Sequence, residues 1–227
     1  MTGNWKGVGR ILSTAGNGAA WRRAKRRAIL REAHRLRGIM VQSFNKGGPP
    51  GKRWKRLSVF TQLVSRAKGL GDRRPLMNSG ALRNSHSVVE VDADTVFVGV
   101  HRTAKSKGQR GRDKQGRFTS RGPGSKLMNI ALIHEHGAGP IYINTSPGSA
   151  SGRRVRNFFL WLHSKTKNHG SGAIMPLKKT TVGIVIRIPP RPWIGPIWER
   201  EGDQAAQNIM RGTIAGLGVP GLSRLIR

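Results

Sequence analysis

Residues 18–44 read GAAWRRAKRRAILREAHRLRGIMVQSF, and this stretch decides the fold that we expect for the chain. Apolar side chains recur in it at spacings of three and four, which gathers them on one side of an α-helix. They are Ala24, Ala28, Ile29, Ala33, Leu36, Met40 and Phe44. The glycines and prolines of residues 47–51 disfavour a continuing helix, so the sequence predicts one long helix over residues 18–44.

Arginines dominate the polar side of this helix. Arg23, Arg27, Arg31 and Arg35 are spaced four residues apart, with Arg22, Arg26 and Arg37 beside them. Like charges at this spacing destabilise an isolated helix by about 0.2–0.5 kcal/mol per pair, and Glu32 is the only acid within the helix. A solvated charged face is the alternative, but such faces ordinarily contain interspersed acids. We therefore expect DNA or an acidic partner to contact Arg22, Arg23, Arg26, Arg27, Arg31 and Arg35.

The whole chain shares this excess of positive charge. Its 227 residues include 42 Lys and Arg against 10 Asp and Glu, a formal net charge of +32. Such repulsion opposes compaction of an isolated monomer, which predicts a polyanion or an acidic protein as a partner. The absence of cysteine excludes disulfides, thiolate zinc sites and cysteine catalysis. Apolar runs are too short to cross a bilayer and residues 1–6 lack a signal-peptide pattern, so we expect a soluble protein with no membrane partner.

Beyond the first helix, the sequence predicts an α+β fold with one antiparallel sheet, a C-terminal helix and long basic loops. Helical patterns cover residues 55–68, 127–136 and 197–217, and strand patterns cover residues 88–91, 95–100, 154–162 and 180–188. Residues 92–94 (Asp-Ala-Asp) are typical of a hairpin turn, and residues 79–83 are typical of a capped turn. Residues 103–126, rich in Lys, Arg, Gly and Ser, are interpreted as a flexible basic loop.

The same features set the expected domain organisation. We expect an N-terminal extension over residues 1–17, a single domain over residues 18–217 and a C-terminal tail over residues 218–227. Residues 103–126 and 144–178 are interpreted as insertions in that domain, because they interrupt the periodic segments with Ser, Gly and basic residues.

Residue types that bind metals or catalyse reactions are present, but their spacing does not specify a site. His134 and His136 cannot share one ion on a helix, because side chains two residues apart point in different directions. Glu90 and Asp92, with His101, offer the ligands of a divalent-metal nuclease, although a solvated hairpin tip is the simpler interpretation. We therefore expect no enzyme activity, no catalytic residue, no metal and no cofactor.

Four short patterns follow one another along the chain. Residues 54–57 (WKRL) come first, and residues 75–83 (PLMNSGALR) precede the hairpin. Residues 131–137 (ALIHEHG) follow the basic loop, and residues 188–195 (IPPRPWIG) precede the last helix. This order resembles the tailed-phage virion morphogenesis family, the tail-completion or neck proteins typified by protein G of phage Mu. The matching positions are Trp54, Gly80, Leu82, His134, Gly137, Arg191, Pro192, Trp193 and Gly195, with Trp193 standing where the family usually has Phe.

The resemblance implies a non-enzymatic structural protein of the virion, made in the host cytoplasm and located at the head–tail junction. Proteins of this family complete the tail and help to join it to the DNA-filled head. They form rings, commonly six-fold. The implied partners are therefore further copies of this chain, other neck and tail proteins such as the tail tube, the terminator and head-completion rings, and DNA in the channel.

The motif residues themselves are expected to be structural. Pro189 and Pro190 fix an extended backbone, Trp193 anchors the core, and Gly195 lets the chain enter the last helix. An RNA-binding ribonucleoprotein component, such as a ribosomal protein, is the alternative function, since it would share the basic composition. The chain's six Trp and the order of the motifs argue against that alternative.

Overall fold

The computed structural model describes residues 18–69, 75–77, 80–101, 103–105, 110–112, 118–121, 126–146, 148–167, 174–178 and 181–217. The expected N-terminal extension (1–17) and C-terminal tail (218–227) lie outside these residues. Within the described residues, the α+β class expected from the sequence is confirmed.

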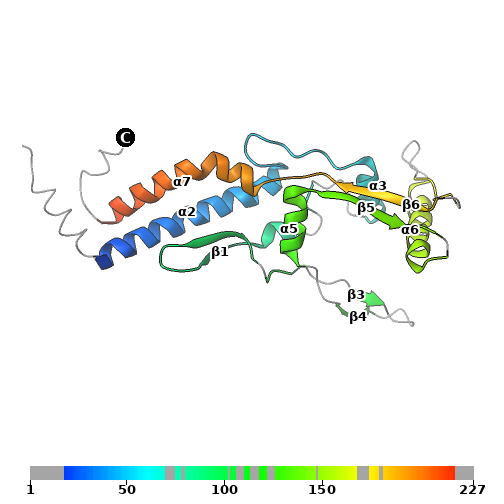
Figure 1. Ribbon diagram of the computed structural model, residues 1–227, viewed down its shortest axis with the longest axis horizontal. Coiled ribbons are helices and arrows are strands. Elements are labelled where there is room, and N and C mark those ends of the chain that lie inside the picture. Colours follow the sequence, from blue (N-terminus) through cyan, green and yellow to red (C-terminus); the bar gives the residue numbers. More distant parts are fainter. Residues whose placement is uncertain are drawn as a thin grey trace, which may run out of the picture.

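Two long helices form one half of an elongated molecule (Figure 1). α2 (Gly18–Lys46) and α7 (Ile194–Gly216) run antiparallel and side by side. β5 (Ala138–Asn144) and β6 (Gly183–Ile188) extend from them toward α3 (Val59–Ala67) and α6 (Ala150–Thr166), and α5 (Leu127–His136) stands in the middle. Among the described residues, no helix combines the length and the apolar character that a membrane span requires.

The long N-terminal helix is confirmed and ends at Lys46. Its buried side chains include Ala24, Ala28, Ala33, Leu36, Met40 and Phe44, which belong to the stripe predicted from their spacing. Gly48 follows with φ +155°, and a Cβ there would lie 2.2 Å from the Lys52 carbonyl oxygen, so the turn requires glycine. The turn returns Trp54 to the helix end, where its backbone N–H donates to the Gly47 carbonyl oxygen.

The predicted hairpin is confirmed as β1 (His86–Glu90) paired with β2 (Val96–Val100), and both strands pack against α2. The short helix α4 (Ala81–Asn84) precedes it and begins after the left-handed Gly80, with φ +69° and no side-chain cap. Ser79 of the capped turn expected over residues 79–83 lies outside the described residues. In the hairpin turn, the Asp92 carboxylate accepts the backbone N–H of Asp94 at 2.8 Å.

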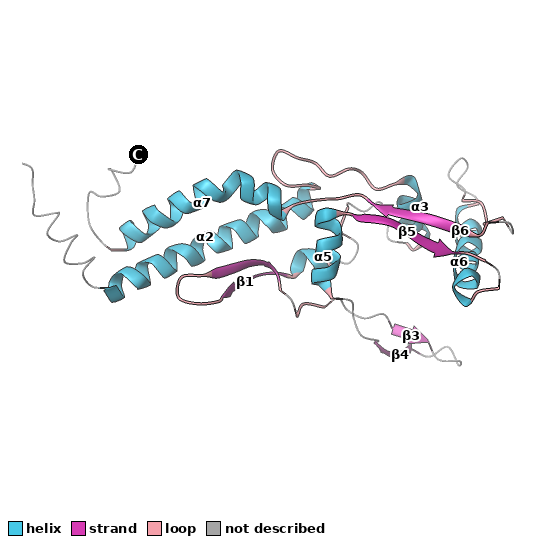
Figure 2. Cartoon of the chain, in the orientation of Figure 1, coloured by secondary structure: helices cyan, strands magenta, loops and turns pink. Residues whose placement is uncertain are grey.

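The expected single sheet is corrected by the structure. The described strands form three separate antiparallel pairs, β1–β2, β3–β4 and β5–β6 (Figure 2). β3 (Arg110–Arg112) and β4 (Phe118–Arg121) lie within residues 103–126, which the composition predicted to be a loop. A bridge between Lys105 and Lys126 joins the two ends of that segment.

The strand β5 was not predicted from the sequence, because Gly137, Gly139 and Pro140 are typical of residues that end a helix and begin a loop. The register of the β5–β6 ladder shifts between Ala138 and Ile141, so an irregularity in the pairing accommodates the proline. β6 and the irregular proline segment after it agree with the prediction.

α6 corrects the strand predicted over residues 154–162. Ser149 Oγ accepts the Gly152 N–H at 2.9 Å and caps the helix, while Leu162 and Thr166 are buried one turn apart. Aromatic and β-branched residues favoured a strand. The helical spacing over 17 residues, longer than an ordinary strand, was the better signal.

The core lies where the C-terminal end of α2 meets the start of α7. Phe44 stands at its centre, with ring centroids 5.4 Å from Trp54, 5.2 Å from His86 and 5.3 Å from Trp193, all in edge-to-face geometry. Trp54 and Trp193 are 8% and 0% exposed. Both tryptophans are therefore packing residues, as expected, and are not available to stack on nucleic-acid bases.

Candidate functional site

Small residues bring α2 and α7 into close contact. A Cβ added to Gly212 would lie 3.1 Å from Cβ of Ala28, and one added to Gly216 would lie 3.0 Å from Cβ of Ala24. These pairs are one helical turn apart on both helices. A glycine inside a helix costs about 1 kcal/mol relative to alanine. The close approach of the two backbones is therefore the physical reason for glycines that otherwise weaken α7.

One turn farther along α2, the contact between the helices becomes ionic. Buried Glu32 accepts hydrogen bonds from Arg35 Nε at 2.6 Å and from Asn208 Nδ2 at 3.2 Å. Arg35 Nη1 donates to Glu201 Oε2 of α7 at 2.6 Å. Arg35 is thus held between carboxylates of both helices. This corrects the expected uniform arginine stripe, because the charge of Arg35 is balanced within the chain.

Acids at the tip of the β1–β2 hairpin balance the charge of a second part of α2. Arg26 Nε donates to Glu90 Oε2 at 2.6 Å, and Lys25 Nζ lies 3.0 Å from Asp94 Oδ1. Because these pairs are exposed to solvent, each contributes at most about 1 kcal/mol to stability. Their main consequence is electrostatic: Arg26 is a weaker candidate for anion contact than the sequence suggested.

Four exposed arginines of α2 keep an unbalanced charge, whereas Arg37, which also lacks a carboxylate partner in the described part of the chain, donates to the His86 carbonyl oxygen. Arg22, Arg23, Arg27 and Arg31 are exposed, and none has a carboxylate partner among the described residues. Arg23 and Arg27, together with Arg26 and Leu30, line one shallow hollow on the helix surface. We call the surface formed by Arg22, Arg23, Arg27 and Arg31 the arginine surface of α2.

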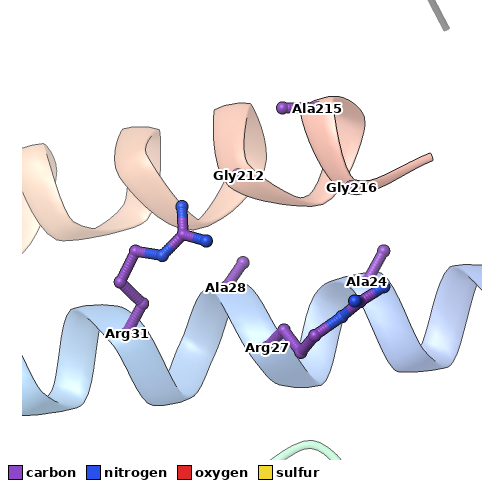
Figure 3. Close-up of a pocket in the computed structure, with 7 residues that line it drawn as sticks. All are labelled: Ala24, Arg27, Ala28, Arg31, Gly212, Ala215 and Gly216. Atoms are coloured by element: carbon purple, nitrogen blue, oxygen red, sulfur yellow. The ribbon is translucent and has the colours of Figure 1, made fainter. Parts of the chain in front are cut away.

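The arginine surface borders the seam between the helices (Figure 3). A groove of about 230 Å³ lies there, lined by Ala24, Arg27, Ala28, Arg31, Gly212, Ala215 and Gly216. Arg31 reaches across toward α7, whereas Arg27 extends along α2. Arg31 and Arg211 of α7 also line an adjoining hollow of about 540 Å³.

This arrangement suits an extended anion. Residues four apart on a helix are separated by about 6 Å along its axis, so Arg23, Arg27 and Arg31 present guanidinium groups at regular intervals. Guanidinium groups donate in a planar fork that matches phosphate oxygens. Such contacts hold a nucleic-acid backbone without reading its sequence.

The motif residues gather elsewhere, where α5 meets the start of α7. The Glu135 carboxylate accepts the backbone N–H groups of Trp193 at 2.9 Å and Ile194 at 3.3 Å through Oε2, and of Gly195 at 3.0 Å through Oε1. Pro196 has no N–H to satisfy, and the Ile197 N–H makes the first bond within the helix. Glu135 thus caps α7 from a different helix, with a charge that favours the positive end of the helix dipole.

Three further contacts connect the same motifs. A Cβ on Gly137, where φ is +79°, would lie 2.9 Å from the Ile188 carbonyl oxygen, so the close passage of the two segments requires glycine. The Arg191 N–H donates to the His134 carbonyl oxygen at 2.6 Å. The Trp54 indole N–H donates to the Pro192 carbonyl oxygen at 2.9 Å. The sequence patterns at residues 54, 131–137 and 188–195 therefore meet in space.

The residues considered for a nuclease are not brought together. Glu90 pairs with Val96 and His86 pairs with Val100, so His101 lies at the opposite end of the hairpin from Glu90. His101 Nδ1 instead contacts the Thr103 hydroxyl at 2.7 Å. In the part of the chain that the structure describes, no three His, Asp or Glu side chains lie close enough to hold a metal ion.

Comparison with known proteins provides no relative, since no family model, no curated protein and no solved structure matches the chain. Geometry alone therefore identifies several residues that the sequence did not single out. Glu135 and Glu201 are examples, since each bonds an element far from it in the chain, and Arg211 lines a hollow together with residues of α2. No local pattern could reveal these placements.

Proposed function

We propose that this chain is a non-enzymatic structural protein of a phage virion that acts at the head–tail junction and helps to join the tail to the DNA-filled head. The observation that carries the proposal is the meeting of the motifs that resemble the tail-completion family. Trp54, Leu82 and Trp193 share one hydrophobic core. A set of short patterns that converges in space is a better basis for a resemblance than patterns that are only ordered along the chain.

The β5–β6 ribbon supports assembly into a homo-oligomeric ring. Tyr142 and Val185 face each other across the ladder and are 77% and 54% exposed. Ile141 and Ile186, the neighbouring pair, are also exposed. A two-stranded ribbon is marginal in water on its own, and its open edges can pair with another chain. Neighbouring copies in a ring would cover these side chains.

The arginine surface of α2 supports a position beside DNA. Its four unbalanced cations would repel one another in every copy of a ring, and six copies of the whole chain would carry 6 × 32 = +192 charges. Phosphates of DNA passing through a channel would offset that repulsion without requiring any particular sequence.

The test is a deletion of the gene in the phage that encodes this chain. We expect the lysate to contain DNA-filled heads and separate tails, because the joining layer is missing. Addition of the purified protein should restore joined, infectious particles, and labelled protein should be detected at the neck by electron microscopy. The Trp193→Ala protein, whose core is disrupted, is the negative control.

Two outcomes would count against the proposal. Joined particles in the deletion lysate would show that the chain is not needed at the junction. Sedimentation of the native chain with host ribosomal RNA, and not with virions, would favour the ribonucleoprotein alternative.

A further inference from the structure

Arg191 carries a buried positive charge that no described side chain balances. Its side chain is 6% exposed, and its Nε has no hydrogen-bond partner. Burial lowers the pKa of its guanidinium, and no carboxylate acts in the opposite direction. The small exposed part leaves the group reachable from the surface of the subunit.

Arg35, whose side chain is 33% exposed, shows that this chain balances even a half-buried arginine with its own acids. Two carboxylates, those of Glu32 and Glu201, hold it at 2.6 Å each. A buried charge without such a partner costs several kcal/mol, so an unpaired arginine is expected to be paired in the assembled protein. The contrast between the two arginines therefore points to an acid supplied from outside the subunit.

His134 provides a second group with the same requirement. Its Nδ1 is buried without a partner, and its carbonyl oxygen accepts the Arg191 N–H. Burial, and then the charge of Arg191, lower the pKa of the His134 imidazole. One carboxylate can accept from a guanidinium and from an imidazole N–H at the same time, since its two oxygens offer about four acceptor sites. A single acidic side chain bound to the exposed part of the Arg191 guanidinium would therefore also lie beside the His134 imidazole.

We propose that Arg191 and His134 form a receptor for a carboxylate of a second copy of this chain, supplied by Glu199 or Asp203. The proposal rests on the homo-oligomer of the proposed function and names a contact within it. The receptor residue Arg191 lies just before α7, and the acids Glu199 and Asp203 lie in its first turns. The same region of each subunit would therefore receive one carboxylate and donate another to the next subunit.

The acids that are not already bonded within the subunit identify this donor. Six of the eight described acids are engaged within the subunit: Glu32, Glu90, Asp92, Asp94, Glu135 and Glu201. Glu199 and Asp203 are the other two. Both are exposed, they lie one turn apart on α7, and neither contacts another described side chain through a hydrogen bond or an ion pair. Trp198 beside them is 62% exposed. An exposed tryptophan next to unpaired charges is typical of a surface that a protein partner covers.

The first experiment compares the size of full-length variants by analytical ultracentrifugation at physiological salt. Arg191→Met removes the charge and keeps most of the side-chain volume, and we expect it to abolish assembly. Thermal melting below the assembly concentration should show that this variant is at least as stable as the wild-type monomer, because the unpaired buried charge is gone. Arg53→Met, which removes one exposed cation, is the matched control and should assemble like wild type.

The second experiment mixes two variants that each lack one half of the contact. Glu199→Gln/Asp203→Asn should remain monomeric alone, as should Arg191→Met. A mixture still contains one intact receptor and one intact acid, so it should form dimers that grow no further. Dimers in the mixture, with monomers in each separate sample, would be difficult to explain by a role of Arg191 in folding.

The outcomes separate this inference from the proposed function. Normal assembly of Arg191→Met, or assembly of the acid variant, would overturn the inference while leaving the oligomer in place. A clear loss of monomer stability in Arg191→Met would overturn it too, since the arginine would then stabilise the subunit itself. A wild-type chain that stays monomeric would overturn both the inference and the ring.

Discussion

Trp193 donates its indole N–H to Nε2 of His86 at 3.0 Å, and this bond joins two buried side chains that lie 107 residues apart in the chain. The other ring nitrogen, Nδ1 of His86, lies 3.1 Å from the Arg83 carbonyl oxygen. A carbonyl can only accept, so Nδ1 carries the proton and the imidazole is neutral. One histidine thus connects the hairpin, the turn before it and the start of α7.

Trp193→Phe tests this bond separately from the packing of the ring. Phenylalanine retains most of the apolar contact but leaves His86 Nε2 without a donor. An unsatisfied buried acceptor costs about 1–3 kcal/mol, so we expect a lower melting temperature with the fold intact. Trp193→Ala should cost more, about 3–5 kcal/mol, because it also empties the site. Equal melting of wild type and Trp193→Phe would show that the bond contributes nothing.

The same bond predicts a dependence of stability on pH. Burial, and to a smaller extent the nearby charge of Arg37, lowers the pKa of His86 from its ordinary 6.5, and burial also lowers that of His134. In the unfolded chain these groups bind protons first as the pH falls. Stability should therefore be complete above about pH 6.5 and be lost as the pH falls below it, by up to about 1.4 kcal/mol per pH unit for each histidine.

His86→Gln isolates the contribution of His86 to this profile. The glutamine amide oxygen can accept the Trp193 N–H but does not titrate. Denaturant unfolding between pH 4.5 and 8 should give a flatter profile for the variant than for wild type, with the remaining slope due to His134 and the other groups. An identical slope in both proteins would contradict the assignment.

Glu135→Ala tests the cap of α7. Its removal leaves the N–H groups of Ile194 and Gly195 without their carboxylate, and loss of a helix cap costs about 0.5–2 kcal/mol. We expect reduced helicity by circular dichroism and a lower melting temperature. Gln207→Ala removes an exposed polar side chain of the same helix that has no hydrogen-bond partner among the described residues, and it is the control, which should melt like wild type. No difference between the two variants would exclude a capping role.

Substitutions at two glycines of α7 are expected to change the stability of the protein in opposite directions. A Cβ on Gly202 would lie 3.8 Å from the nearest atom, whereas one on Gly212 would lie 3.1 Å from Ala28 Cβ. Gly202→Ala should therefore stabilise the protein by up to about 1 kcal/mol through helix propensity. Gly212→Leu should destabilise it by about 1–3 kcal/mol, because it forces the helices apart. Thermal melting of both variants checks the difference.

The spacing of apolar residues predicted individual helices and strands, but it did not predict the contacts between them. α2, the β1–β2 hairpin and α7 each carry a regular spacing of apolar residues, and each is confirmed. α6 was wrongly predicted because residue type favoured a strand while spacing favoured a helix. The pairing of Arg35 with Glu201 could not be predicted, since the two residues are 166 positions apart, whereas Glu32, its other partner, is only three residues away. The same reason applies to Glu135 and the cap of α7.

Binding of DNA to the arginine surface of α2 is the remaining prediction. Binding in vitro should be independent of sequence and should weaken steeply with salt, by about 0.9 log unit per log unit of salt for each phosphate neutralised. Arg23→Gln, Arg27→Gln and Arg31→Gln combined should lower that slope and leave melting unchanged, because these side chains are exposed and unpaired. The matched control replaces three exposed cations of the α6 region, Arg154, Lys165 and Lys167, and should keep the slope nearer to that of wild type. An unchanged slope in the α2 variant would mean that this surface contacts protein, and an acidic face on an adjoining ring would then be the partner to seek.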